Sequence, residues 1–229
     1  IMPSLVGSEM CIRDSPATVE LAFGSILVAI LISVPLGIAA ATHHRTWLDG
    51  TSMVTAMLGV SMPSFWLGLL LIMLFALKLG WLPSGGREGF AALILPALTL
   101  GANQAGSLTR ITRSSMLDVI RQDYLRTARA KGVSEKQVIR KHALKNALIP
   151  IITVFGSTLG GAFGGAIMIE TVFSWPGVGR LTVRAINDRD MTLATGCIIM
   201  FTMFMTLTIL LVDIAYAFVD PRIKARYSK

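Results

Sequence analysis

Five long apolar stretches restrict the fold of this chain more than any other feature. Each has about 20 residues with few charges, and at about 1.5 Å per residue such a helix crosses the roughly 30 Å hydrocarbon core of a membrane. A hydrophobic content of 53% in 229 residues is too large for one soluble core. The sequence therefore predicts an all-α, polytopic membrane helical bundle, with spans near residues 19–41, 54–77, 91–111, 150–169 and 193–219.

A strongly cationic stretch, Arg110–Asn146, separates the third span from the fourth. It holds ten Lys and Arg residues against three acidic ones. Such a stretch cannot lie in lipid, and an excess of Lys and Arg marks the cytoplasmic side. We therefore place an insert, residues 114–148, and the basic tail, residues 221–229, in the cytoplasm, and the loops 78–90 and 170–191 outside. The net charge of +8 does not indicate nucleic acid, because aromatic residues that could stack on bases are sparse nearby.

The insert is expected to form two helices that are separated at Gly132. Ser134 is a favourable N-cap with Gln137 three residues later, and Val133 and Val138 have the spacing of a hydrophobic staple. The second helix mixes basic and apolar residues, which suits docking into a groove on a partner protein. The alternative is an amphipathic helix that lies on anionic lipid.

Polar residues inside the spans are the candidates for a translocation path. Pro63 interrupts the second span, where it acts either as a hinge or pore-lining element or as a simple packing kink. Thr99, Asn103, Ser107, Arg110 and Ser114 share one face of the third span, and the first three are candidates for the path. This face either lines a route or bonds to a neighbouring helix. In the fourth span Gly156, Gly160 and Gly164 recur every four residues and predict close helix packing.

The remaining polar and thiol groups indicate no metal site and no catalytic site. His43 and His44 lack further ligands and are interpreted as loop residues, and Cys11 and Cys197 as structurally incidental. No Ser, His and Asp set or carboxylate pair shares one plausible site, so we expect no enzyme. An ion-coupled secondary transporter or channel is the alternative function. It is disfavoured because Asp213, the obvious carboxylate inside a span, lies near the cytoplasmic edge.

The first 15 residues match nothing that follows. They show no usable helical period and lack the apolar centre of a signal peptide, and the run from Leu5 to Ser15 resembles a translated sequencing-adapter read-through. We expect residues 1–15 to be a non-native leader and residues 16–220 to form the transmembrane domain. Five spans place the start of the first span outside, which predicts that an earlier span is missing and that the chain is N-terminally truncated.

Several motifs resemble the permease subunits of ABC importers, and most closely the B-type subunit of the peptide and nickel transport systems. The residues that carry the resemblance are Asp123–Gly132, His142, Ala143, Leu144, Asn146, Ala147 and Pro150 in the insert, Pro63–Trp66, Glu170, Phe173–Gly177, Gly179 and Arg180, and Asp220–Arg222. They occur in the family's order over nearly all of the chain after Ser15. One departure is that Arg126, Thr127 and Ala128 stand where the general motif has a Glu and two alanines. The family's first span and its large external region are also absent.

The resemblance implies a multi-pass subunit of a bacterial-type inner or plasma membrane that imports peptides or related solutes, such as nickel, by alternating access. Its partners would be a second homologous permease, two cytoplasmic ATPase subunits that bind ATP and Mg²⁺, and an external solute-binding protein. This chain itself would bind no cofactor and no metal. The implied ATPase-coupling residues are Arg126, Ala128, Lys131, Gly132, Ser134 and Gln137. The implied contacts with the binding protein are Glu170, Trp175, Pro176 and Arg180.

Overall fold

All regular secondary structure in residues 2–219, the part of the chain that the computed structural model describes, is helical. Side chains are described from Glu9 onward, except at positions 149, 153, 155, 157, 159, 213 and 215–219. The elements are α1 (Met2–Thr42), α2 (Trp47–Ser61), α3 (Ser64–Leu71), η1 (Ile72–Lys78), α4 (Phe90–Ile120), α5 (Asp123–Ala130), α6 (Glu135–Gln137), η2 (Val138–Ala143), α7 (Leu144–Val172), α8 (Val178–Asn187) and α9 (Met191–Val219). The segments η1 and η2 are π-helical. The predicted all-α fold is confirmed.

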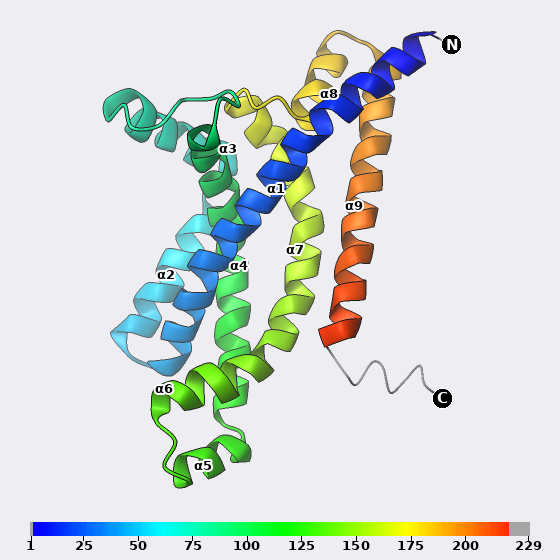
Figure 1. Ribbon diagram of the computed structural model, residues 1–229. Coiled ribbons are helices and arrows are strands. Elements are labelled where there is room, and N and C mark those ends of the chain that lie inside the picture. The colour runs from blue at the N-terminus through cyan, green and yellow to red at the C-terminus, as the bar shows by residue number, and fades with distance from the viewer. Residues whose placement is uncertain (1, 220–229) are drawn as a thin grey trace, which may run out of the picture.

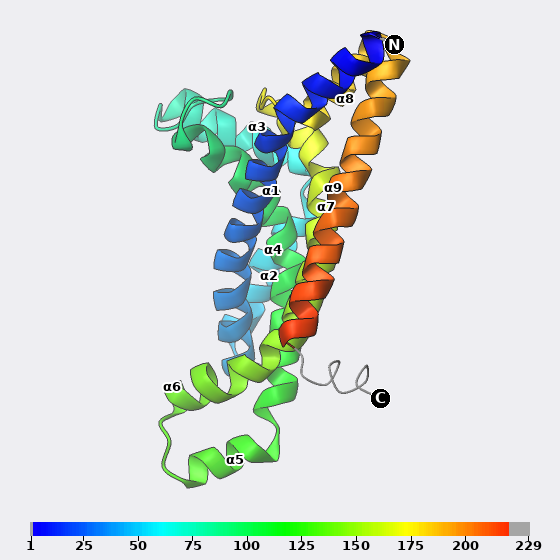
Figure 2. The ribbon, with the colours of Figure 1, turned by 45° about the vertical axis from the view of Figure 1, so that its right-hand side comes forward.

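The long helices form an elongated bundle with two different ends (Figure 1). The start of α1, the loop before α4 and helix α8 lie at one end, while α5 and α6 lie at the other. A view turned by 45° shows the same separation (Figure 2). The arrangement agrees with the predicted sidedness, in which the cationic insert lies opposite the loops with few or balanced charges. The side chain of Asp213, which was predicted to lie near the cytoplasmic edge, is outside the described residues.

Three helical segments within the described residues are long and apolar enough to cross a membrane by themselves. They are Glu9–Thr42, Phe90–Ile120 and Met191–Val212. The pair formed by α2 and by α3 with η1 would add a fourth span. Helix α7 covers the predicted fourth span, and its apolar end is Gly160–Val172.

The predicted second span is not one kinked helix. It divides into α2 and the pair of α3 and η1, with a bend of 101° between them. Met62, just before Pro63, has φ −83° and ψ 130°. Proline lacks an N–H group and disfavours the helical conformation in the residue before it, so the helix ends here. Pro63 itself is exposed and begins the new direction.

The N-terminal segment also differs from expectation. Helix α1 runs through it without interruption from Met2, although no helical period was evident in its sequence. Cys11 is fully buried in a cluster with Val178, Leu181 and Cys197. The two cysteines were interpreted as structurally incidental, but their Sγ atoms lie 2.6 Å apart as free thiols. Helices α8 and α9 pack against α1, and the cluster around Cys11 joins all three helices.

Helices α1 and α4 form the most extensive pair in the bundle, and α2 packs on the other flank of α4. Small residues make the close approach possible. A methyl group at Gly101 would lie 2.5 Å from the Ser25 carbonyl oxygen of α1, and one at Gly106 would collide with the Ala56 carbonyl of α2. Helices in lipid associate through such tight packing because apolar burial alone gives them little driving force.

The glycines predicted to pack helix α7 do so only in part. Gly156 lies against Val212 of α9, and Gly160 lies against Ile209 and Met205. Gly164 has open space where its Cβ would be, so the prediction is wrong at this position. The α4 glycines described above, which sequence reasoning did not identify, approach the backbone of neighbouring helices, whereas Gly156 and Gly160 meet side chains.

Candidate functional site

The insert between the third and fourth predicted spans is a helical hairpin that turns at Gly132. This glycine has φ +79°, a left-handed conformation that other residues adopt only with strain. Helix α5 precedes the turn, and α6 and η2 follow it and continue into α7 without a gap. Helix α6 begins after Ser134 as predicted, but the Ser134 side chain makes no capping hydrogen bond. The backbone carbonyl of Ser134 accepts the Gln137 and Val138 N–H groups instead.

A small hydrophobic core holds the insert against the bundle. Leu125 of α5, with Val138 and Ala143 of η2, is fully buried together with Met116 of α4 and Ala41 of α1. Val133 packs against the same cluster, so both residues of the predicted hydrophobic staple are in it. The insert is therefore anchored to the inner ends of three long helices, since Ile151 of α7 also belongs to this core.

Polar bonds close the hairpin across its turn. Arg129 donates from Nε and Nη2 to the two carboxylate oxygens of Glu135, at 3.0 and 2.9 Å. This hydrogen bond with Arg129 lowers the pKa of Glu135, so the pair stays charged at neutral pH. The Asn146 amide donates to the Tyr124 hydroxyl at 2.8 Å, which ties α7 to α5. Both residues belong to the motifs noted in the sequence.

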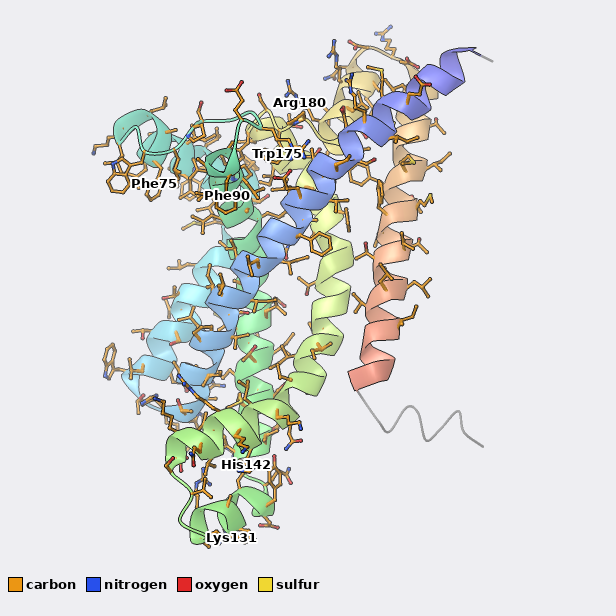
Figure 3. The ribbon with its side chains drawn as sticks, in the orientation of Figure 1. Phe75, Phe90, Lys131, His142, Trp175 and Arg180 are labelled. Carbon is orange, nitrogen blue, oxygen red and sulfur yellow. The ribbon has the colours of Figure 1, made fainter. Side chains whose placement is uncertain are left out.

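The structure places five of the six coupling candidates on the exposed surface of the insert. Ala128 is the exception, because it is partly buried against the hydrophobic core of the insert. Lys131 lies at the tip of the hairpin, farthest from the long helices (Figure 3). The exposed candidates are Arg126, Lys131, Gly132, Ser134 and Gln137.

A charged cluster that sequence reasoning missed joins the turn between α1 and α2 to α4. Arg113 donates from Nε and Nη2 to the Asp49 carboxylate at 2.6 and 2.7 Å. The ring of His44 lies 3.1 Å from both partners, and Asp49 is only 6% exposed. The available signal was a carboxylate near the end of one span and an arginine near the end of another. Their pairing could not be read from spacing, because 64 positions separate them.

The predicted polar face of α4 divides into two parts. Thr99 is fully buried and its hydroxyl donates to the Leu95 carbonyl, while the Asn103 amide donates to the Gly59 carbonyl of α2 at 3.3 Å. Ser107 and Arg110, further along the same face, are exposed in this single chain. The outer part of the face therefore packs against its own helices, and the inner part is open.

Gln104, next to Asn103, is a second polar group that was overlooked. Its amide nitrogen and oxygen are both buried, and neither has a hydrogen-bond partner. The side chains that precede and follow it by one helical turn point to α7: Leu100 lies beside Gly165, and Leu108 clusters with Val154. A buried amide without partners is unusual and requires an explanation.

Of the four candidates for contact with the binding protein, two are buried and two are exposed. Glu170 and Trp175 are fully buried, so the prediction that they touch an external protein directly is wrong. Glu170 accepts the Thr18 hydroxyl at 2.7 Å and the Arg180 N–H at 3.0 Å, and the Trp175 indole donates to the Ala17 carbonyl at 2.8 Å. Pro176 and Arg180 are exposed. The buried pair thus fixes α1, α7 and α8 together, and the exposed pair lies at the surface, where Arg180 is labelled in Figure 3.

Residues 33–225 match the family described as binding-protein-dependent transport system inner membrane component. The chain is 44% identical over 219 residues to the glutathione transport system permease protein GsiC of Salmonella choleraesuis strain SC-B67 and to that of Escherichia coli strain K12. These alignments cover 96% of this chain and 71% of each relative.

Solved structures with the same fold are also ABC transporters. The inward-facing MetNI methionine ABC transporter has a chain that is similar with a TM-score of 0.80 at 19% identity, over 92% of this chain and 96% of that chain. A chain of an amino acid ABC transporter with histidines has a TM-score of 0.69 at 13% identity, over 96% of this chain and 97% of that chain.

The family match argues against the alternative function, an ion-coupled transporter or channel, because the matched family transports solutes in dependence on a binding protein. Permeases of this kind are not catalytic, and ATP is bound by their ATPase partners. The chain belongs to the binding-protein-dependent transport system inner membrane components and is the permease subunit of an ABC importer, which works with ATPase subunits and an external binding protein.

Proposed function

We propose that this permease imports small peptides or closely related solutes. The support is the 44% identity to permeases named for glutathione, which is itself a tripeptide. A reconstituted transporter should take up labelled glutathione or dipeptides in an ATP-dependent way. Uptake of nickel or of single amino acids, with no uptake of peptides, would contradict this substrate class.

The transport unit contains a second, homologous permease and two ATPase subunits. The supporting observation is the open inner part of the polar face on α4, where Ser107, Arg110 and Ser114 are exposed. Polar residues within a span are costly in contact with lipid and usually face protein or water. A second permease that covers this face would enclose a path between the two subunits. Thr99 and Asn103 would stabilise the outer half of α4 along this path. Pro63 would lie beside the path, where α2 ends.

The insert transmits the ATPase cycle to the spans. The observation that carries this proposal is the continuity of α6, η2 and α7, together with the hydrophobic core that binds the insert to α1 and α4. ATP binding would close the ATPase pair and move the insert, and the spans would then change from inward-open to outward-open. Shifting such an equilibrium from about 1:99 to 99:1 needs about 5.5 kcal/mol, which a loose loop could not deliver.

The continuity exists on one side of the insert only. Helix α4 ends at Ile120, and Arg121 and Gln122 form a turn before α5 begins. The insert is therefore not joined to α4 by a continuous helix. On that side Met116 and Leu125 make the connection through side-chain packing. We assign the main mechanical link to α7.

Substitution of Gly132 by valine tests the coupling role. A β-branched residue at φ +79° is strained, so the turn should distort and substrate-stimulated ATP hydrolysis should be lost while the permease still inserts and assembles. Gly80→Val is the matched control. Gly80 has φ +65° and open space around it, but it lies in the loop at the opposite end of the bundle. Normal stimulation in Gly132→Val would count against the proposal.

Pro176 and Arg180 form the contact surface for the binding protein. Both are exposed at the external end, and Arg180 Nη1 donates to the Ser174 carbonyl at 2.6 Å, which holds the arginine beside the loop. Arg180→Glu should therefore raise the concentration of binding protein needed for half-maximal ATPase stimulation. The basal ATPase rate should stay unchanged. An unchanged concentration dependence would exclude Arg180 from the surface.

A further inference from the structure

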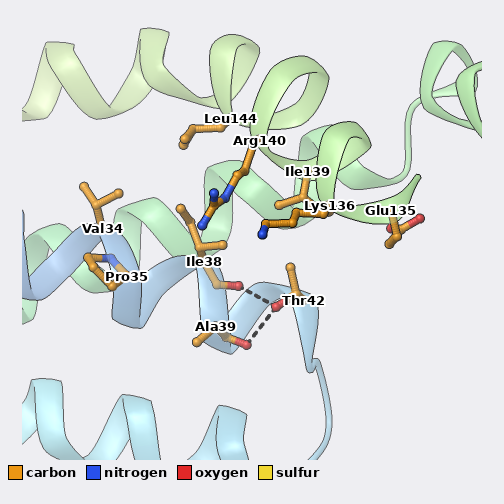
Figure 4. A pocket seen from close by; sticks show the side chains of 10 residues that line it. All are labelled: Val34, Pro35, Ile38, Ala39, Thr42, Glu135, Lys136, Ile139, Arg140 and Leu144. Carbon is orange, nitrogen blue, oxygen red and sulfur yellow. Dashed lines mark hydrogen bonds between the residues drawn. The ribbon is translucent and has the colours of Figure 1, made fainter. Parts of the chain in front are cut away.

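A groove runs between the inner end of α1 and the second half of the insert. It has a volume of about 600 Å³. Val34, Pro35 and Ile38 of α1 line one side, and Lys136 and Arg140 reach into the gap from the other side (Figure 4). The groove is thus apolar toward the membrane helix and cationic toward the cytoplasmic insert.

The two cations have no internal role in the described part of the chain. Neither Lys136 nor Arg140 makes a salt bridge or a side-chain hydrogen bond there. Glu135 also lines the groove, but Arg129 neutralises its carboxylate with two hydrogen bonds. The last carbonyls of α1 do not require the cations either, because the Thr42 hydroxyl bonds to the Ile38 and Ala39 carbonyls at 2.9 and 3.2 Å.

The apolar side of the groove continues along the membrane-spanning part of α1. Leu27 and Leu31 are 59% and 64% exposed, and Pro35 follows them at the same four-residue spacing. These residues therefore form one stripe on the helix surface, leading from the span into the groove. The cations lie where this stripe reaches the insert, near the end of the candidate span Glu9–Thr42, where lipid headgroups would meet water.

We propose that this groove binds an anionic phospholipid of the inner leaflet. Its phosphate lies between Lys136 and Arg140, and an acyl chain follows Pro35, Leu31 and Leu27 along α1. Long basic side chains at a membrane surface attract anionic headgroups, and the alkyl stems of both residues add apolar contact. A bound lipid would fasten α6 and η2 to α1. This binding does not require the insert to act as the coupling element.

An ATPase subunit is the competing occupant of a cationic groove on this insert. Two of the exposed coupling candidates lie elsewhere, since Lys131 is at the hairpin tip and Arg126 is on α5. Ser134 and Gln137 adjoin the groove but do not line it. An ATPase surface would also gain nothing from the apolar stripe that continues into the span. The combination of two cations without internal partners and an apolar track along α1 favours lipid.

The test compares lipid retained by the complete transporter after purification in detergent. The complex is reconstituted with phosphatidylcholine, with or without phosphatidylglycerol, and bound lipid is quantified by mass spectrometry. In Lys136→Gln with Arg140→Gln, retained phosphatidylglycerol should fall about tenfold, because both headgroup cations are lost. Lys141→Gln with Lys145→Gln is the control, since it removes the same charge from exposed positions that do not line the groove.

Two further arms separate the alternatives. Val34→Trp should lower phosphatidylglycerol retention with both cations intact, because the indole fills the groove. Soluble glycerol phosphate should not displace the lipid, since it lacks the hydrocarbon chain. Equal retention in the two charge variants, or displacement by glycerol phosphate, would overturn the proposal. Loss of the ATPase subunits from the Lys136→Gln, Arg140→Gln complex in phosphatidylcholine alone would identify the groove as an ATPase contact instead.

Discussion

Two polar side chains in the bundle interior have opposite environments. The Glu170 carboxylate is fully buried but is bonded on both oxygens, to the Thr18 hydroxyl and the Arg180 N–H. The Gln104 amide is buried with neither atom bonded. Buried polar groups stabilise a fold only when their hydrogen bonds are made. These two residues therefore predict opposite responses to substitution.

Replacing Glu170 by alanine should destabilise the permease. The Thr18 hydroxyl and the Arg180 N–H would remain buried without an acceptor, which costs about 2 kcal/mol or more. Thermal unfolding in detergent should therefore occur at a clearly lower temperature. Glu170→Gln, which keeps one oxygen acceptor and nearly the same shape, should lose much less. Equal losses for both variants would show that the hydrogen bonds are not the cause.

Replacing Gln104 by methionine should have the reverse effect. Methionine has a similar volume, and it removes two unsatisfied polar atoms whose burial costs about 1–3 kcal/mol. The variant should unfold at a higher temperature than the parent. Asn103→Leu is the matched comparison and should unfold at a lower temperature, because Asn103 donates a hydrogen bond to the Gly59 carbonyl. A less stable Gln104→Met would show that the amide has a partner in the folded state.

The sequence identified Glu170 and Trp175 as candidate site residues, but it did not identify their structural role. The motif at Glu170 and Trp175 was evident, but its burial depends on Thr18 and Ala17, which lie more than 150 positions away. No local pattern reports such a contact. Pro176 and Arg180, which were chosen from the same motif, remain available at the surface.

The insert shows how local signals define an element. Gly132 predicted the break between its helices, because glycine tolerates the left-handed conformation that it has here. Ser134 predicted the start of the second helix, although its side chain forms no cap. The clamp between Arg129 and Glu135 was not predicted, because its two residues become neighbours only after the chain turns at Gly132.

This clamp should protect the turn from opening. Arg129→Glu places two carboxylates together, so the Gly132 and Val133 amides, which bond to the Arg129 and Ala128 carbonyls, should exchange their hydrogens faster. The double exchange Arg129→Glu, Glu135→Arg should restore most of the protection. Because the pair is largely exposed, its contribution is below about 1 kcal/mol and global stability should hardly change.

The clamp also has a defined pH dependence. Arg129 lowers the pKa of Glu135 below the ordinary value of 4.5. A carboxyl with a lowered pKa stabilises the folded state fully above its unfolded pKa and loses this effect as the pH falls through the folded value. Protection of the turn should therefore be constant at neutral pH and decrease only in acid below 4.5. A decrease between neutral pH and the ordinary value would contradict the assigned partner.

At the scale of the whole molecule, apolar length and charge asymmetry predicted the helical class and the opposite placement of the insert and the external loops. They could not predict the 101° bend before α3, because a proline within a span permits either a kink or a complete break. They also could not predict which helices touch. The Asp49–Arg113 pair and the α4 glycines depend on how α1, α2 and α4 meet.

We propose that the insert drives the spans through its rigid junction with α7. Four glycines placed between Ala143 and Leu144 test this most directly, since about one added turn keeps the facing of the insert while the link becomes flexible. The same insertion after Arg121, where α4 has already ended, is the control. We predict that the α7 insertion leaves ATPase binding intact and abolishes substrate-stimulated ATP hydrolysis, with a smaller loss in the control. Full stimulation with the α7 junction interrupted would contradict the account.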